Sequence, residues 1–306
     1  MALTGIIRGK IKRPLLMCLY GTEGVGKTTF AAKAEVPIFI GPETGTDDHD
    51  VARFPTPKTF EEILTQVKSL LTETHEFKTM LFDSLDWIEG LLHRELVDKF
   101  KAKSIEDIGG GYGRYVALVN NEWMKLIELV KELRETKKMN AVFIAHYHVK
   151  VFNDPMTALP YDRYQMKLLE KTSVIFREFV DVLGFATFDV VSRGSSDRAT
   201  KGKGMGEGAR VLYTEKRPSH DAKNRFSLPY VLPLDFTMFI EKMNMGTEDK
   251  VKEIRQDIID LMLDLTDKTI VEKITEAMKD EKLAYATLVQ YKNRIITILN
   301  GGKNGN

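Results

Sequence analysis

Eight residues near the N-terminus have the types and spacing of a loop that binds phosphate. Gly21-Thr22-Glu23-Gly24-Val25-Gly26-Lys27-Thr28 follows the apolar run 15–20 and precedes the helix-forming segment 28–34. Glycines let backbone N–H groups turn onto an anion, and the helix adds a favourable dipole there. In this pattern Lys27 reaches the β- and γ-phosphates and Thr28 holds Mg²⁺. The sequence therefore predicts a P-loop for Mg-ATP from Gly21 to Thr29, and the flanking strand and helix disfavour a Gly-rich turn without a ligand.

An aspartate at the end of another apolar run is the expected second metal residue. Met80-Leu81-Phe82 leads directly into Asp83. A P-loop nucleotide requires a carboxylate near its metal ion at the end of a neighbouring strand. Taken alone, Asp83 is equally suited to cap a helix. Beside a P-loop the metal role is favoured, so Thr28 and Asp83 are the predicted magnesium residues.

Hydrolysis also needs a group that orients or deprotonates the attacking water. Glu43, in Gly41-Pro42-Glu43-Thr44-Gly45, follows the apolar run 37–40 and is the candidate. The alternative is an exposed loop glutamate, because Asp47, Asp48 and Asp50 make this loop acidic in any case.

A histidine ends the fourth apolar run and is a candidate sensor of the γ-phosphate. His146 follows residues 140–145, where a polar side chain can report the phosphate to the loop behind it. His148 is a second candidate for the same task. The alternative for either residue is a hydrogen-bonded polar side chain without a catalytic role.

Strands and helices alternate through the first half of the chain. Strands are expected at 15–20, 37–40, 79–82 and 140–145, and helices at 28–34, 59–71, 84–100 and 115–137. This alternation predicts an α/β fold with a mainly parallel sheet covered on both faces, and a ligand at the carboxyl ends of its strands.

The pattern of expected strands and helices changes after residue 179. Residues 179–191 and 210–214 are expected to be two strands of a β-hairpin with 192–208 as a mobile tip, and residues after 246 have helical spacing. The predicted organisation is an ATPase core at 1–240, a helical appendage at 247–300 and a disordered tail at 301–306.

Overall composition excludes some classes of protein and leaves nucleic-acid binding to local patches. Lys and Arg number 45 and Asp and Glu 44, so the net charge of +1 gives no general attraction to polyanions. The single cysteine, Cys18, rules out an intramolecular disulfide, and no apolar run approaches the roughly 20 residues of a membrane span. A cytoplasmic protein with no membrane partner is expected.

Cations and aromatic residues gather in two segments. Residues 150–171 are expected to form an irregular segment, with candidate DNA contacts at Lys150, Arg163, Tyr164, Lys167 and Lys171. Between 192 and 225 nine Lys or Arg face four acids, nine minus four giving +5, with further candidates at Arg198, Lys201 and Lys203. An ordinary solvated surface is the alternative for both segments.

The order of these motifs resembles phage-encoded RecA-like ATPases, and in particular their core-only single-strand annealing proteins. The likeness spans roughly 15–235, through the P-loop, Glu43, Asp83-Ser84, His146 and the segment Lys223 to Pro229. It implies a RecA-like core in which Glu43 is the catalytic glutamate and ATP lies between subunits of a filament or ring. It also implies basic residues acting in trans, for which the candidates are Lys216, Arg217, Lys223 and Arg225. A full recombinase has an N-terminal domain before its core, whereas about 14 residues precede the first strand here.

The resulting hypothesis is an ATP-dependent recombination or annealing protein that binds single-stranded DNA. Lys27, Glu43, Asp83 and His146 are its catalytic candidates, ATP and Mg²⁺ its cofactors, and a phage or host single-strand DNA-binding protein a further partner inside the host cell. A nucleotide-gated loader or scaffold and, less favoured, a small-molecule kinase are the alternatives.

Overall fold

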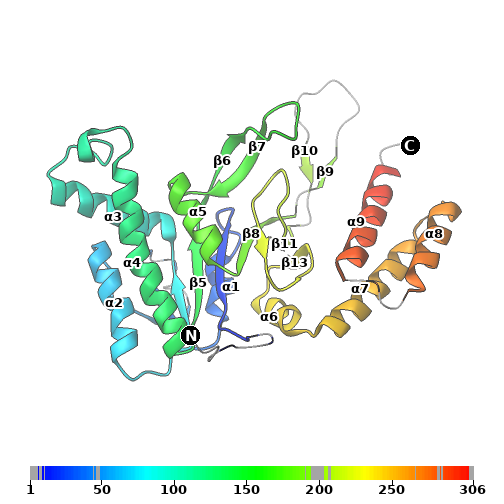
Figure 1. Cartoon of the computed structure of the whole chain (residues 1–306), viewed down its shortest axis with the longest axis horizontal. Helices are drawn as coiled ribbons and strands as arrows, with labels where there is room; N and C mark the ends of the chain where they lie inside the picture. Colours follow the sequence, from blue (N-terminus) through cyan, green and yellow to red (C-terminus); the bar gives the residue numbers. More distant parts are fainter. Residues whose placement is uncertain are drawn as a thin grey trace. The chain divides into compact units, whose positions relative to one another are not determined.

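The computed structural model describes residues 11–43, 45, 49–189, 191–193, 203–205, 208–265, 267–280, 283 and 285–302, together with Ile6 and Gly9. The chain divides into two compact units, residues 1–240 and 241–306. Figure 1 traces the first unit from blue to yellow and the second in orange and red.

The first unit is built on a mainly parallel sheet. Within the described residues the strand order is β13-β11-β8-β1-β5-β4-β2-β3, with β12 beside the start of β8. The strands from β8 to β3 run parallel, and β11, β12 and β13 are antiparallel to their neighbours. The bounds are β1 Leu16–Gly21, β2 Pro37–Ile40, β3 Ala52–Arg53, β4 Thr79–Phe82, β5 Asn140–Ala145, β8 Val182–Phe188, β11 Arg210–Tyr213, β12 Lys223–Asn224 and β13 Val231–Pro233.

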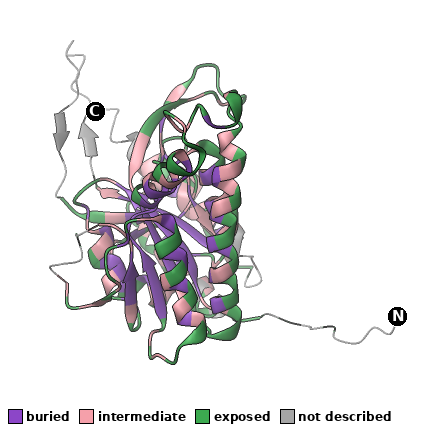
Figure 2. Cartoon of the chain, turned by 90° about the vertical axis from the view of Figure 1, so that its left-hand side faces the viewer, coloured by how far each residue is buried: buried purple, intermediate pink, exposed green. Residues whose placement is uncertain are grey.

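Helices cover both faces of this sheet. The core on one face joins Leu16, Cys18 and Tyr20 of β1 to the helices α2 to α5. On the other face Phe30 of α1 packs edge-on against Phe236 and Phe239 of α6. Figure 2 shows the buried strands lying behind helices that are exposed on their outer sides. The helices are α1 Lys27–Ala32, α2 Phe60–Thr72, α3 Leu85–Phe100, the 3₁₀ helix Ile108–Gly110, α4 Tyr115–Thr136, α5 Glu170–Phe179 and α6 Phe236–Asn244.

Burial on both faces explains why the central strands read as continuous apolar runs. Every residue of β1 and β4 is buried, as parallel strands between two helical layers require. The predicted α/β fold with a mainly parallel sheet is confirmed.

The segment expected to be irregular, 150–171, is a hairpin and the start of a helix. β6 (Tyr147–Phe152) and β7 (Tyr161–Met166) pair antiparallel over six residue pairs, and α5 begins at Glu170. Neither strand alternates apolar and polar residues cleanly, so the periodicity of a half-buried strand is missing from the sequence. The prediction of an irregular segment was therefore wrong.

The basic region after β8 contains the expected pairing and one further ladder. β8 and β11 pair antiparallel, with Arg210 opposite Phe188. Within the expected tip, β9 (Val191–Arg193) pairs with β10 (Lys203–Met205). Arg198 and Lys201 lie outside the described residues, and only the backbone of Lys203 is described.

The second unit contains three helices in its described part, α7 (Thr247–Met262), α8 (Lys268–Met278) and α9 (Tyr285–Gly302). They enclose a small core of Ile254, Ile258, Ile274, Leu288 and Ile295. Helix α9 includes Gly301 and Gly302, the first two residues of the expected tail at 301–306. Residues 303–306 lie outside the described residues.

None of the helices in the described ranges combines the length and apolar character needed to cross a membrane.

Candidate active site

Four neighbouring strands bring the predicted catalytic residues to one edge of the sheet. The spatial order β1-β5-β4-β2 places the P-loop, His146, Asp83 and Glu43 side by side, each just beyond the carboxyl end of its strand. This edge is where parallel α/β sheets bind their ligands.

The glycines of the P-loop have backbone conformations that residues with a side chain rarely adopt. Gly24 and Gly26 have φ angles of 69° and 97°, which favour glycine. Lys27 is only 7% exposed and donates hydrogen bonds to the carbonyls of Gly21 and Thr22, both at 3.0 Å. Burial lowers the pKa of Lys27, against the opposing effect of nearby carboxylates. The loop thus presents a buried ammonium group suited to a phosphate.

Thr28 and Asp83 form a pair that fits a magnesium ion. The Thr28 hydroxyl donates to an Asp83 carboxylate oxygen at 2.8 Å, and Asp83 is 4% exposed. Burial raises the pKa of Asp83 to about 6. Hydroxyl and carboxylate oxygens are ligands that Mg²⁺ accepts, and a bound divalent cation would favour the ionised carboxylate. When bound, Mg²⁺ would supply charge neutralisation at the phosphates of ATP.

Replacing Asp83 with Asn is expected to stabilise the free protein. Because the folded pKa lies above the ordinary value of 3.8, stability is lost as the pH rises from about 4 to about 6. Asp83→Asn removes that loss and should increase the free energy of unfolding at pH 8 by up to about 3 kcal/mol, with a smaller gain at pH 5. Thermal unfolding in EDTA without nucleotide measures it.

The matched control for this measurement is Asp162→Asn, an exposed carboxylate on β7, which should leave the unfolding temperature unchanged. An Asp83→Asn variant no more stable than the wild type at pH 8 would show that burial does not disfavour this carboxylate.

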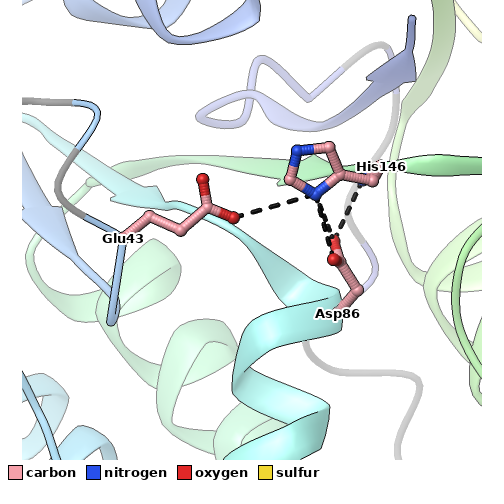
Figure 3. A group of neighbouring side chains, drawn as sticks. All are labelled: Glu43, Asp86 and His146. Carbon is pink, nitrogen blue, oxygen red and sulfur yellow. Dashed lines mark hydrogen bonds and ion pairs between the residues drawn. The ribbon is translucent and has the colours of Figure 1, made fainter. Parts of the chain in front are cut away.

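Glu43, Ser84, Asp86 and His146 form one hydrogen-bonded cluster. The Ser84 hydroxyl donates to Glu43, and the Nδ1 atom of His146 lies 3.7 Å from the same glutamate. Asp86 accepts from the backbone N–H of His146 at 3.0 Å and from its Nδ1 at 3.0 Å. Figure 3 shows Glu43 and Asp86 approaching the same ring nitrogen from the loop after β2 and the first turn of α3. The sensor candidate is therefore tied directly to the candidate for water activation.

Asp86 orients His146 and favours its protonated form. Its hydrogen bond raises the pKa of His146 above the ordinary value. Burial would raise the pKa of Asp86, but the hydrogen bonds from His146 outweigh burial and hold it below its usual range. With Nδ1 engaged by Asp86, the other ring nitrogen lies on the side of the ring away from Asp86 (Figure 3). Sequence reasoning missed Asp86, although an acid three residues after Asp83 in the first turn of the next helix was a usable signal.

Ligand atoms of Glu43, Asp86 and His146 all lie within 4.8 Å of one another, a spacing that a metal ion would also accept. Each of the three already has a hydrogen-bond partner in the cluster, which favours a network that positions Glu43 and His146.

A cavity of about 450 Å³ opens beside this cluster. Its lining joins Glu23 of the P-loop to Glu43 and His146, with Lys167 and the half-exposed Trp87 at its sides. Glu43 and His146 are therefore accessible from a cavity that reaches the P-loop at Glu23.

Comparison with known proteins agrees with this arrangement. A family described as an AAA domain matches residues 13–226, which include the P-loop and every residue of the cluster. The chain belongs to this AAA domain family. It is accordingly a nucleotide-binding P-loop ATPase.

This AAA domain also compares as follows with solved structures and with curated proteins. A solved structure titled "Crystal structure of the RadB recombinase" is 16% identical, covers 66% of this chain and 80% of its own, and has a TM-score of 0.37. No curated protein matches the chain.

The AAA domain places the candidate DNA contacts of 150–171 in different environments. Lys150, Lys167 and Lys171 are exposed. Tyr164 is half-buried and stacks on Phe185 with ring centroids 4.9 Å apart.

Arg163 departs from the exposed position expected of a DNA contact. It is 3% exposed, donates to the His220 carbonyl at 3.2 Å and pairs with Asp221 at 3.5 Å. Its guanidinium also lies 4.7 Å from the ring centre of Phe152. Arg163 therefore connects the β6–β7 hairpin to the segment 217–221. Because its side chain is buried in this connection, the expectation that Arg163 is an exposed DNA contact was wrong.

Two of the candidates for action in trans, Lys223 and Arg225, lie away from the P-loop of their own AAA domain. Lys223 pairs with Leu183 at the start of β8, and its Nζ donates to the carbonyls of Arg177 and Glu178 at 2.8 Å. Arg225 bonds Asp181 at 3.1 Å, yet its side chain is 55% exposed. Both residues lie at the amino ends of the parallel strands, the edge opposite the nucleotide site. Lys216 is exposed, and the guanidinium of Arg217 lies 4.2 Å from the ring centre of Tyr230.

Proposed function

We propose that this AAA domain hydrolyses ATP and uses the state of the γ-phosphate to control binding of single-stranded DNA, in recombination by strand annealing. Glu43 is the proposed group that orients the attacking water, and His146 is the proposed sensor. One observation supports this coupling above the others: His146 is hydrogen-bonded within the site, directly precedes β6, and accepts a hydrogen bond from Lys167, the residue after β7.

The proposed role of Glu43 follows from its surroundings. The Ser84 hydroxyl holds one carboxylate oxygen, which leaves the other free to accept a hydrogen bond from water in the cavity. A carboxylate placed in this way polarises the attacking water for in-line displacement. Lys27 would meanwhile stabilise the charge that develops on the phosphate oxygens.

The connection between His146 and the hairpin is covalent on one side and hydrogen-bonded on the other. β6 begins at Tyr147, the next residue, and the carbonyl of His146 accepts from the N–H of Lys167 at 2.9 Å, just after β7. Lys167 also lines the cavity. A movement of His146 on loss of the γ-phosphate would therefore reach both strands of the hairpin at once.

The hairpin and the adjoining helix offer groups suited to a single strand of DNA. Lys150 on β6 and Lys171 on α5 are exposed cations for phosphates. Met156 and Leu159 in the connecting turn are 90% and 76% exposed, and apolar side chains of this kind pack against the faces of unstacked bases.

Assembly into a homo-oligomer, filament or ring, is part of the same proposal. Lys223 and Arg225 lie at the edge opposite the P-loop, and Lys216 and Arg217 follow β11 in the segment that Arg163 connects to the β6–β7 hairpin. From there they would reach a neighbouring subunit rather than their own nucleotide, and would complete the neighbour's site as an arginine finger does. A single-strand DNA-binding protein is the proposed further partner.

ATP hydrolysis measured with single-stranded DNA, with duplex DNA and without DNA at one salt concentration tests the coupling. Single-stranded DNA is expected to stimulate turnover more than duplex DNA. In the double variant Lys150→Gln/Lys171→Gln, DNA affinity should fall. The slope of log affinity against log salt should decrease by about 1.4, because each lysine that no longer neutralises a phosphate removes about 0.7.

Lys68→Gln, an exposed lysine on α2, is the matched control and should behave as wild type. Turnover indifferent to all DNA would reject the DNA proposal and favour the loader or scaffold. Transfer of phosphate to a metabolite in place of water would favour the kinase.

A further inference from the structure

A second cation lies over the P-loop, on a strand that sequence reasoning did not connect with the nucleotide. In the sheet, Gly21 at the end of β1 is opposite Ala186 of β8, and Ala186 is opposite Leu212 of β11. Because β11 runs antiparallel to β8, its first residue, Arg210, lies opposite Phe188, beyond the carboxyl end of β1. Arg210 therefore starts its strand at the edge of the sheet from which the P-loop projects.

The side chain of Arg210 points to the P-loop side of the sheet. A Cβ atom built on Gly26 would lie 2.9 Å from Nη1 of Arg210 and 3.9 Å from its Cζ, with the Cβ of Thr29 at 4.0 Å. The guanidinium thus lies against the P-loop at Gly26. Leu212, two residues along and hence on the same face, packs where a Gly184 side chain would be, next to Leu19.

The charge of Arg210 is available for a ligand. Arg210 is exposed, and within the described ranges no carboxylate lies within 4.0 Å of its guanidinium. A guanidinium presents several donors in a planar fork that matches phosphate geometry. Because Gly26 has no Cβ atom, the Arg210 side chain has room to lie against the loop at this position.

We propose that Arg210 is a nucleotide-binding residue, supplied by the same subunit, that donates to the α- and β-phosphates of a nucleoside di- or triphosphate. In a P-loop the backbone N–H groups cradle the α- and β-phosphates, whereas the lysine reaches the β- and γ-phosphates. Arg210 lies beside the P-loop backbone at Gly26, so we expect its contact to be common to ADP and ATP. This inference rests on nucleotide binding at the P-loop and is independent of DNA coupling.

Equilibrium titration with fluorescent N-methylanthraniloyl-ADP and -ATP in the presence of Mg²⁺ tests the assignment. Arg210→Ala is expected to weaken both nucleotides by a similar factor, roughly 10- to 100-fold, as for the loss of charged hydrogen bonds. Arg210→Lys should recover part of the affinity, since a lysine keeps the charge and loses the fork.

The control is Arg94→Ala, an exposed arginine on α3, which should bind both nucleotides as the wild type does. Unchanged affinity of Arg210→Ala for both nucleotides would overturn the proposal, and so would a loss confined to ATP, which would place the side chain at the γ-phosphate. Wild-type protein that binds neither nucleotide would instead count against the P-loop site itself. An unchanged unfolding temperature without nucleotide would show that the variant is folded.

Discussion

Lys27→Ala is expected to abolish nucleotide-dependent behaviour and to lower ATP turnover by at least about 100-fold. Lys27 is the buried ammonium of the P-loop, and a preorganised donor of this kind contributes on the order of 100- to 1000-fold to the rate. Phosphate release under saturating ATP, together with binding of a fluorescent nucleotide, measures both effects. Turnover that survives the substitution would refute the P-loop assignment.

The loss in Lys27→Ala should come from chemistry and not from unfolding. Burial lowers the pKa of Lys27, so its charge is not expected to be a source of folding stability, and an unchanged unfolding temperature of Lys27→Ala would check this. Lys33→Ala is the matched control. This lysine follows the same helix, has a half-exposed side chain paired with Asp235, and should keep wild-type turnover.

Glu43→Gln is expected to separate binding from hydrolysis. The glutamine oxygen can still accept from the Ser84 hydroxyl, so the loop should keep its place and nucleotide affinity should change little. The neutral amide does not accept a proton, and turnover should fall by about 100-fold or more. Single-turnover hydrolysis beside equilibrium binding of ATP distinguishes the two steps.

Glu61→Gln on α2 provides the control for Glu43→Gln, because it makes the same change at an exposed carboxylate outside the cavity. If Glu43→Gln turns over ATP at the wild-type rate, Glu43 has no part in the reaction and the cluster with His146 needs another explanation.

Sequence periodicity was sufficient for the central sheet because its strands are buried on both faces. Runs such as 15–20 and 79–82 are uniformly apolar, and the residue that follows each one falls at the carboxyl edge by topology alone. Thr28, Asp83, Glu43 and His146 could therefore be placed at one edge before their side-chain contacts were known.

Periodicity failed where strands expose both faces and where tertiary contacts decide burial. β6 and β7 have mixed burial along their length, so no alternation marks them. In the sequence, Arg163 cannot be distinguished from the other cations of its segment. Its burial depends on the tertiary contacts with Asp221 and the ring of Phe152. Asp86 and Arg210 were missed for a related reason, since each acts on an element distant in sequence.

The ordered β6–β7 ladder has a thermodynamic consequence for whatever ligand this hairpin takes up. An irregular segment would have to become ordered on contact, at roughly 1–2 kcal/mol of conformational entropy for each residue fixed. Here six residue pairs are already in register, and both strands are tied to His146. Association with this face should therefore show the small heat-capacity change of rigid docking instead of the large change of coupled folding.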